Sequence, residues 1–131
     1  EIPSEKEWNE YDVLEWENSR REELTEFFGG LSSLYSSHPS LYKNDFDGRF
    51  FRWTEKENDE CLFIFERLSD DGDRLIVALN FSDEKVSKKI LLSPDDEILV
   101  SSGKAEITRT KTMATLKLGK LSSAVIGKKY N

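Results

Sequence analysis

The spacing of hydrophobic residues changes twice along the chain. The first 17 residues mix Trp8, Tyr11 and Trp16 with acidic side chains and follow neither a helical nor a strand period. From Ser19 onward, apolar residues recur every three or four positions, which predicts an amphipathic helix that ends before Pro39. The apolar face of this helix consists of Leu24, Phe27, Phe28, Leu31, Leu34 and Tyr35.

Local residues suggest how this helix begins and what it packs against. Ser19 and Glu22 have the spacing of a capping box, in which both side chains satisfy free amide groups of the first turn. Gly29 and Gly30 cost about 1 kcal/mol each against alanine inside a helix. We therefore expect a large partner to press closely against the helix at the two glycines.

After Pro39 the hydrophobic period becomes two, which is typical of strands. Eight short strands are predicted, at Arg49–Thr54, Cys61–Arg67, Arg74–Phe81, Val86–Leu92, Glu97–Val100, Glu106–Thr110, Met113–Leu118 and Ser122–Ile126. Turn residues separate them, and Gly72 supplies a positive φ for a hairpin. Two runs, 61–65 and 75–79, are apolar at successive positions and are predicted to be central strands. The pattern indicates a mainly β fold: an antiparallel Greek-key β-sandwich preceded by an arm and one amphipathic α-helix.

Composition narrows the function classes. With 131 residues, 37% of them hydrophobic and 34% charged, the chain is typical of a globular domain. A net charge of −7 argues against nucleic acid or an anionic membrane as partner, and no stretch approaches the ~20 apolar residues of a membrane span. A single cysteine and a single histidine exclude an internal disulfide and a Cys/His metal cage. We therefore predict neither a metal nor a cofactor.

No group of residues forms an evident catalytic site, so no catalytic residue is assigned. Asp70, Asp71 and Asp73 surround a turn glycine, and we interpret them as hairpin residues. The segment 45–48 begins like a calcium loop, but Arg49 occupies a ligand position and the glutamate of position twelve is missing.

Three further residues receive structural interpretations. His38 is expected to interact with the last helix carbonyls or with solvent. Cys61 alternates with two phenylalanines and is expected to be a small buried hydrophobe. Asn80 lies in the glycosylation sequon Asn80-Phe81-Ser82, but at a strand end it is expected to hydrogen-bond a neighbouring turn.

The tryptophans Trp8, Trp16 and Trp53 are the candidates for substrate binding, because an exposed indole can stack on a sugar ring. Strand alternation places Phe51 and Trp53 on one face and Phe50 on the other. Since one face of an edge strand must cover the core, we expect at least one of these aromatics to be buried. The accessible set would then be too small for a sugar-stacking platform.

Five segments of the chain resemble the C-terminal end of α-amylase family enzymes, glycoside hydrolase family 13. Glu1-Ile2-Pro3 is similar to the phrase after the seventh barrel strand, and Asp12-Val13-Leu14-Glu15-Trp16 is similar to the segment before the last barrel helix. The segments 26–41, 74–82 and 116–126 resemble that helix with its exit, the domain C strand ending in Leu-Asn-Phe-Ser, and the closing strands. Pro3-Ser4 and Gly29-Gly30 depart from the family's pattern and leave the subfamily open.

The resemblance implies a non-catalytic domain C that braces a catalytic (β/α)8 barrel acting on α-1,4-glucans by a retaining mechanism. The three catalytic carboxylates of such a barrel would lie upstream of Glu1. Residues 1–40 would be the end of the barrel and residues 41–131 the sandwich. The expected partners are that barrel and, through it, an α-glucan. A chain that begins at Glu1 without methionine is expected to be a piece of a longer one, and its exposed helix face favours self-association.

Two alternatives remain open from the sequence. A glycogen branching enzyme has a similar Glu-Trp segment and similar C-terminal strands. A stand-alone carbohydrate-binding or interaction sandwich is the other, although an aromatic arm followed by such a helix is unusual for a binding module. Localisation is undecided.

Overall fold

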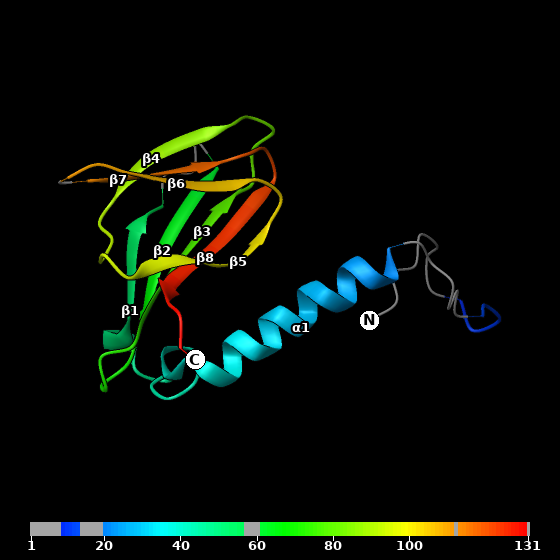
Figure 1. The fold of residues 1–131 in the computed structure, drawn as a ribbon. Coiled ribbons are helices and arrows are strands. Elements are labelled where there is room, and N and C mark those ends of the chain that lie inside the picture. Colours follow the sequence, from blue (N-terminus) through cyan, green and yellow to red (C-terminus); the bar gives the residue numbers. More distant parts are fainter. Residues whose placement is uncertain (1–8, 14–19, 57–60, 112, 131) are drawn as a thin grey trace.

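A computed structural model describes residues 9–13, 20–56, 61–111 and 113–130 of the protein (Figure 1). One α-helix, α1 (Arg21–Ser37), is followed by two 3-10 turns, η1 (Pro39–Leu41) and η2 (Gly48–Phe50). The strands are β1 (Phe51–Glu55), β2 (Leu62–Leu68), β3 (Arg74–Asn80), β4 (Val86–Ile90), β5 (Asp96–Ser102), β6 (Ala105–Arg109), β7 (Ala114–Leu118) and β8 (Ser122–Lys128). Each falls on one of the eight predicted strands, with ends shifted by a few residues.

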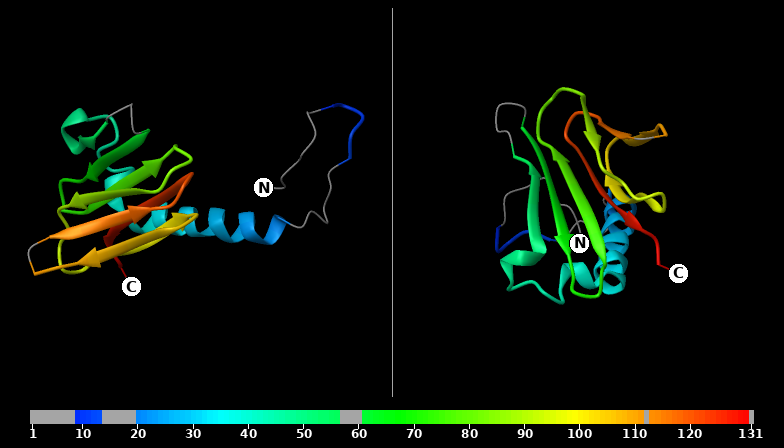
Figure 2. Two further views of the ribbon diagram at one scale, coloured as in Figure 1. Left: turned by 90° about the horizontal axis from the view of Figure 1, so that it is seen from above. Right: turned by 90° about the vertical axis from the view of Figure 1, so that its left-hand side faces the viewer.

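The strands form two antiparallel sheets that face each other (Figure 2). One sheet has the order β1-β2-β3-β8-β5 and the other the order β4-β7-β6. The predicted antiparallel sandwich with one preceding helix is therefore confirmed. The prediction that β2 and β3 are central also holds, and the last strand, β8, is central as well, because it lies between β3 and β5.

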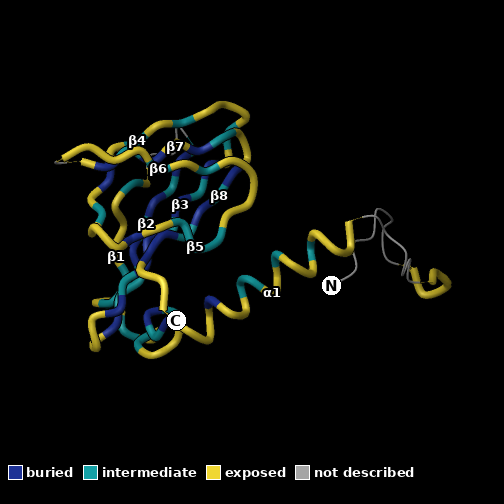
Figure 3. The backbone as a smooth tube through the Cα atoms, in the orientation of Figure 1, coloured by how far each residue is buried: buried dark blue, intermediate teal, exposed yellow. Residues whose placement is uncertain are grey.

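The hydrophobic core lies between the two sheets, where Figure 3 shows the buried backbone. Alternate residues of β2, β3 and β8 point inward from the larger sheet and meet alternate residues of β7 from the smaller one. The core consists of Leu62, Ile64, Ile76, Ala78, Ile90, Ala114, Leu116, Leu118, Ala124 and Ile126. Gly72 has φ +91° in the β2–β3 hairpin, as the turn prediction requires.

Helix α1 begins at Arg21 and ends at Ser37, after which His38 is extended ahead of Pro39 as predicted. Arg20 is the N-cap and makes no side-chain capping hydrogen bond, while Ser19 of the expected capping box lies outside the described residues. The first half of α1 projects beyond the sandwich in Figure 1 and in the left view of Figure 2. Leu34, near the other end, is buried.

The two helix glycines are not closely approached within the described part of the chain. A Cβ on Gly30 would meet Val100 of β5 at 3.8 Å, an ordinary contact, and a Cβ on Gly29 would meet nothing within 4 Å. The expectation of close pressure at these glycines is therefore not met by the chain's own sandwich. The position of Val100 opposite Gly30 shows that α1 packs against the outer side of β5.

The end of α1 is fixed to the sandwich by a buried carboxylate. Asp73 Oδ1 lies 3.0 Å from His38 Nδ1 and accepts a hydrogen bond from the Tyr130 hydroxyl at 3.1 Å, while Oδ2 accepts one from the Ser40 amide at 3.0 Å. The prediction that His38 interacts with helix carbonyls or solvent was wrong, because His38 is only 2% exposed and its ring contacts Asp73. Asp73 likewise does more than form a hairpin turn, because it joins α1, η1 and the C-terminal segment.

Candidate interdomain interface

The outer face of the five-stranded sheet, which points away from the core, carries an uncharged row of side chains. The strand register places one residue from each strand side by side. This row consists of Trp53, Phe65, Val77, Val125 and Val100. Val100 is also the residue that faces Gly30, so α1 and the row form one continuous surface.

Aromatic rings extend this surface around β1 and β2. Trp53 contacts Phe51, Phe63 and Phe65 with ring centroids 5.3 to 6.3 Å apart, and Phe63 contacts Phe81 at 5.9 Å. Trp53 is 47% exposed and Phe81 62% exposed. We call the row together with Phe51, Phe63 and Phe81 the apolar face. Exposed aromatic surface of this extent is typical of interaction sites.

The structure corrects the expected orientation of β1. Phe50 lies in η2 rather than in the strand, and neither Phe51 nor Trp53 is buried in the core. The opposite side of β1 carries Arg52, which pairs with Glu66 of β2. Phe51 and Trp53 therefore both lie on the outer side of β1. Trp8 and Trp16, the other binding candidates, lie outside the described residues.

The outer face of the three-stranded sheet provides an internal comparison. Its positions alternate with the core residues of β4, β6 and β7 and are hydroxyl-bearing or charged. They are Ser87, Lys89, Glu106, Thr108, Thr115 and Lys117. This composition is typical of a sheet face in contact with water, whereas the apolar face of the other sheet is not.

Charged groups beside the apolar face are neutralised by one another. Arg67 pairs with Asp45 and donates to the carbonyls of Ser40 and Leu41. Toward the core side, Arg74 bridges Glu66 and Asp96. Burial alone would raise the pKa of Glu66, but hydrogen bonds from Arg74 and Arg52 hold it below its ordinary value. Arg67, which lies opposite Phe51 of the apolar face in the strand register, therefore has a carboxylate partner.

The remaining candidate residues have structural roles. Cys61 was expected to be buried, but it is only half-buried and has φ +50° ahead of β2, because the strand begins one residue later than the alternation suggested. Asn80 is buried, and its amide donates to the carbonyls of Glu84 and Gly119 at 2.8 and 2.7 Å, which confirms the turn interpretation. Its amide nitrogen is therefore occupied within the fold.

The acidic turns are also held by cations. Lys43 pairs with Asp70 and Asp71, and Arg49 pairs with Asp47, where its hydrogen bonds lower the pKa of that carboxyl to about 2. Among the described residues, His, Cys, Asp and Glu side chains form no cluster able to hold a metal ion. Within the same ranges, no helix has the length and hydropathy required to cross a membrane.

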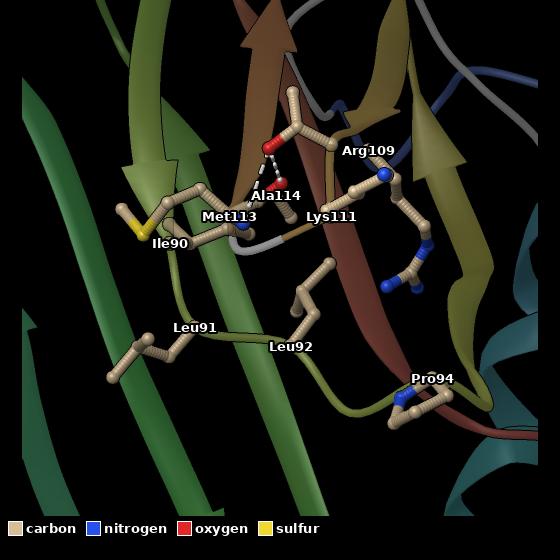
Figure 4. A pocket seen from close by; sticks show the side chains of 9 residues that line it. Ile90, Leu91, Leu92, Pro94, Arg109, Lys111, Met113 and Ala114 are labelled. Carbon is tan, nitrogen blue, oxygen red and sulfur yellow. Dashed lines mark hydrogen bonds between the residues drawn. The ribbon is translucent and has the colours of Figure 1, made fainter.

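A pocket of about 330 Å³ lies between the β4–β5 connection and the β6–β7 turn (Figure 4). Leu91, Leu92 and Met113 lie around it. Its arginine, Arg109, already donates to the carbonyls of Ser93 and Asp96. No carboxylate lines the pocket, so it offers no acid/base pair for glycoside hydrolysis.

Comparison with known structures shows which solved proteins share this fold. No family model matches the chain. A solved debranching enzyme of Nostoc punctiforme superimposes on 93% of the chain and 25% of its own length, with a TM-score of 0.66 and 15% sequence identity. At this identity the likeness shows the fold alone, an antiparallel β-sandwich with one preceding helix.

The sequence relatives are 1,4-α-glucan branching enzymes. A 1,4-α-glucan branching enzyme of Prochlorococcus marinus (strain MIT 9301) is 34% identical over 88 residues, which cover 63% of this chain and 12% of the relative. A branching enzyme of Francisella philomiragia is 34% identical over 83 residues, covering 58% of this chain and 13% of the relative. The chain is thus related to a C-terminal domain of α-amylase-type or branching enzymes, and it spans about an eighth of those relatives.

Proposed function

We propose that this chain is a non-catalytic domain that braces the catalytic barrel of an enzyme acting on α-1,4-glucans. Residues 1–40 would form the end of that barrel and residues 41–131 its supporting sandwich. The observation that carries the proposal is the apolar face, which continues onto α1 where this helix packs on β5 near Val100. Burying such a surface stabilises by about 25 cal/mol per Å².

The dimensions of the apolar face suit a layer of helices. Four inter-strand spacings of ~4.8 Å make the row about 19 Å wide. Helices pack ~8 to 10 Å apart, so two neighbouring helices fit across the row. Helix α1, already seated at the β5 edge, would be continuous with such a layer. An outer layer of helices is the surface that a (β/α)8 barrel presents.

A branching enzyme is the favoured parent over an amylase, because the sequence relatives named above are branching enzymes. The stand-alone sugar-binding alternative is less well supported. Trp53 meets the rings of Phe51, Phe63 and Phe65 at 60 to 81°, so neighbouring rings do not form the flat surface on which a sugar chain stacks.

Two experiments test the proposal. Sequencing the gene upstream of the Glu1 codon should reveal alternating strands and helices with a Phe-any-any-Asn-His-Asp motif, and a gene without this pattern would refute the parent enzyme. Sedimentation of the 131-residue chain should show concentration-dependent association through its uncovered apolar face. Phe63→Lys should abolish this association, whereas Thr115→Lys on the opposite sheet should not. Equal effects of the two variants would remove the apolar face from the proposal.

A further inference from the structure

Charge is divided unevenly along this chain. Residues 1–84 contain 22 acidic and 9 basic side chains, whereas residues 85–131 contain 4 acidic and 10 basic ones. Residues 85–131 include the whole three-stranded sheet, which lies on the far side of the sandwich from α1 (Figure 1), as well as β5 and β8 of the larger sheet. The net charge of −7 therefore conceals a basic region on one side of the molecule.

A hollow of about 720 Å³ lies within this basic region, where β4, β6 and β7 approach the end of β5. Lys85, Lys104 and Lys117 line it together with one acidic residue, Glu106. The hydroxyls of Ser87 and Ser101 add polar groups to the wall, and part of its lining is apolar, from Val86, Ala105 and Leu118. Its size is within the usual range of small-ligand sites.

The lysines of the hollow differ in their ion pairing from most cations of the acidic segment, residues 1–84. There, Lys43, Arg49, Arg52, Arg67 and Arg74 each pair with a carboxylate. In contrast, the three lysines of the hollow form no ion pair with any residue of the described ranges. Even Glu106, although opposite Lys117 in the β6–β7 register, makes no ion pair with it there.

We propose that this hollow binds a phosphate group. Three ammonium groups and one carboxylate leave two positive charges, and a phosphate monoester carries ~1.5 to 2 negative charges at neutral pH. Phosphate oxygens accept the charge-assisted hydrogen bonds that lysine donates. The phosphate can come from free inorganic phosphate or from a phosphorylated sugar, whose ring would contact Val86 and Ala105. This site is on the opposite side from the apolar face and does not depend on the proposed bracing function.

Isothermal titration of the 131-residue chain at low ionic strength provides the test, with inorganic phosphate and glucose 6-phosphate as probes and glucose as the uncharged control. We expect saturable binding of at least one phosphate probe and none of glucose. Tighter binding of glucose 6-phosphate would assign the site to a phosphorylated sugar, and equal or tighter binding of inorganic phosphate would assign it to the free ion.

Matched variants locate the binding. Lys104→Gln and Lys117→Gln should each weaken binding about tenfold or more, because each removes one charge-assisted contact. Lys128→Gln removes the same charge from an exposed position outside the hollow and should leave affinity within about twofold. Equal losses in all three variants would reduce the effect to net charge and overturn the proposal, as would linear, non-saturating heats up to ~50 mM with both phosphate probes.

Discussion

Removing the Asp73 carboxylate should destabilise the protein strongly. In Asp73→Ala the Ser40 amide and His38 Nδ1 lose their acceptor, and both residues are almost completely buried. A buried donor left without a partner costs about 1 to 3 kcal/mol, so for two donors we expect a loss of about 2 to 6 kcal/mol. The total free energy of unfolding of a domain of this size is ~5 to 15 kcal/mol. The Tyr130 hydroxyl adds less, since Tyr130 is 45% exposed and can turn to water.

Urea unfolding followed by far-UV circular dichroism measures this loss. Asp70→Ala is the matched control, because Asp70 lies in the same hairpin but its side chain is 53% exposed and pairs with the exposed Lys43. It should shift the midpoint little. Amide exchange should separate local from global effects, with α1 exchanging faster in Asp73→Ala before the sandwich does. If Asp73→Ala unfolds at the same urea concentration as Asp70→Ala, the carboxylate does not anchor the helix and the reasoning fails.

Four further results are expected. Burial alone would raise the pKa of Asp73, but hydrogen bonds from Ser40 and His38 hold it below its ordinary value. The stability that the Asp73 carboxylate contributes is therefore present above ~pH 4 and is lost as pH falls through the folded pKa. Urea midpoints should accordingly decline less with acid in Asp73→Asn than in the wild type. Gly103→Ala should cost about 1 to 3 kcal/mol in thermal or urea unfolding, because φ is +75° and a Cβ would overlap Ser122 Oγ, whereas Gly29→Ala, in open space, should be neutral or stabilising. Purified chain should release no reducing sugar from soluble starch, and activity that persists through purification and disappears in Asp70→Ala would contradict this. Maltoheptaose should leave tryptophan fluorescence unchanged at micromolar concentration; saturable quenching lost in Trp53→Ala would instead favour a sugar-binding module.

The strands could be predicted because their determinants are local. Alternation within each strand and a turn residue such as Gly72 after it define a segment without knowledge of its neighbours. The contact between His38 and Asp73 could not be predicted in this way. Thirty-five positions separate the two residues, and only the pairing of the β2–β3 hairpin with the end of α1 brings them together.

The sequence pattern of β2 indicates the apolar face, but the same pattern is compatible with two interpretations. Phe63 and Phe65 alternate with Leu62 and Ile64, so β2 is apolar on both sides. This pattern was interpreted as centrality in a sheet, which is correct. It equally indicates that the second side of an antiparallel sheet is covered by something else, and that meaning became evident only when the register placed Phe65 beside Trp53 and Val77.

The position of β8 determines when this domain can fold during synthesis. β5 has no partner in its sheet other than β8, and β3 needs β8 on its second edge. A ribosome-bound chain that stops at residue 121 therefore has a three-stranded β1-β2-β3 sheet with an unpaired β3 edge and an unattached β5. Such open edges can pair with other nascent chains. Completion of the larger sheet must wait until β8 leaves the exit tunnel, and the segment that follows β8 brings Tyr130 to Asp73 and His38.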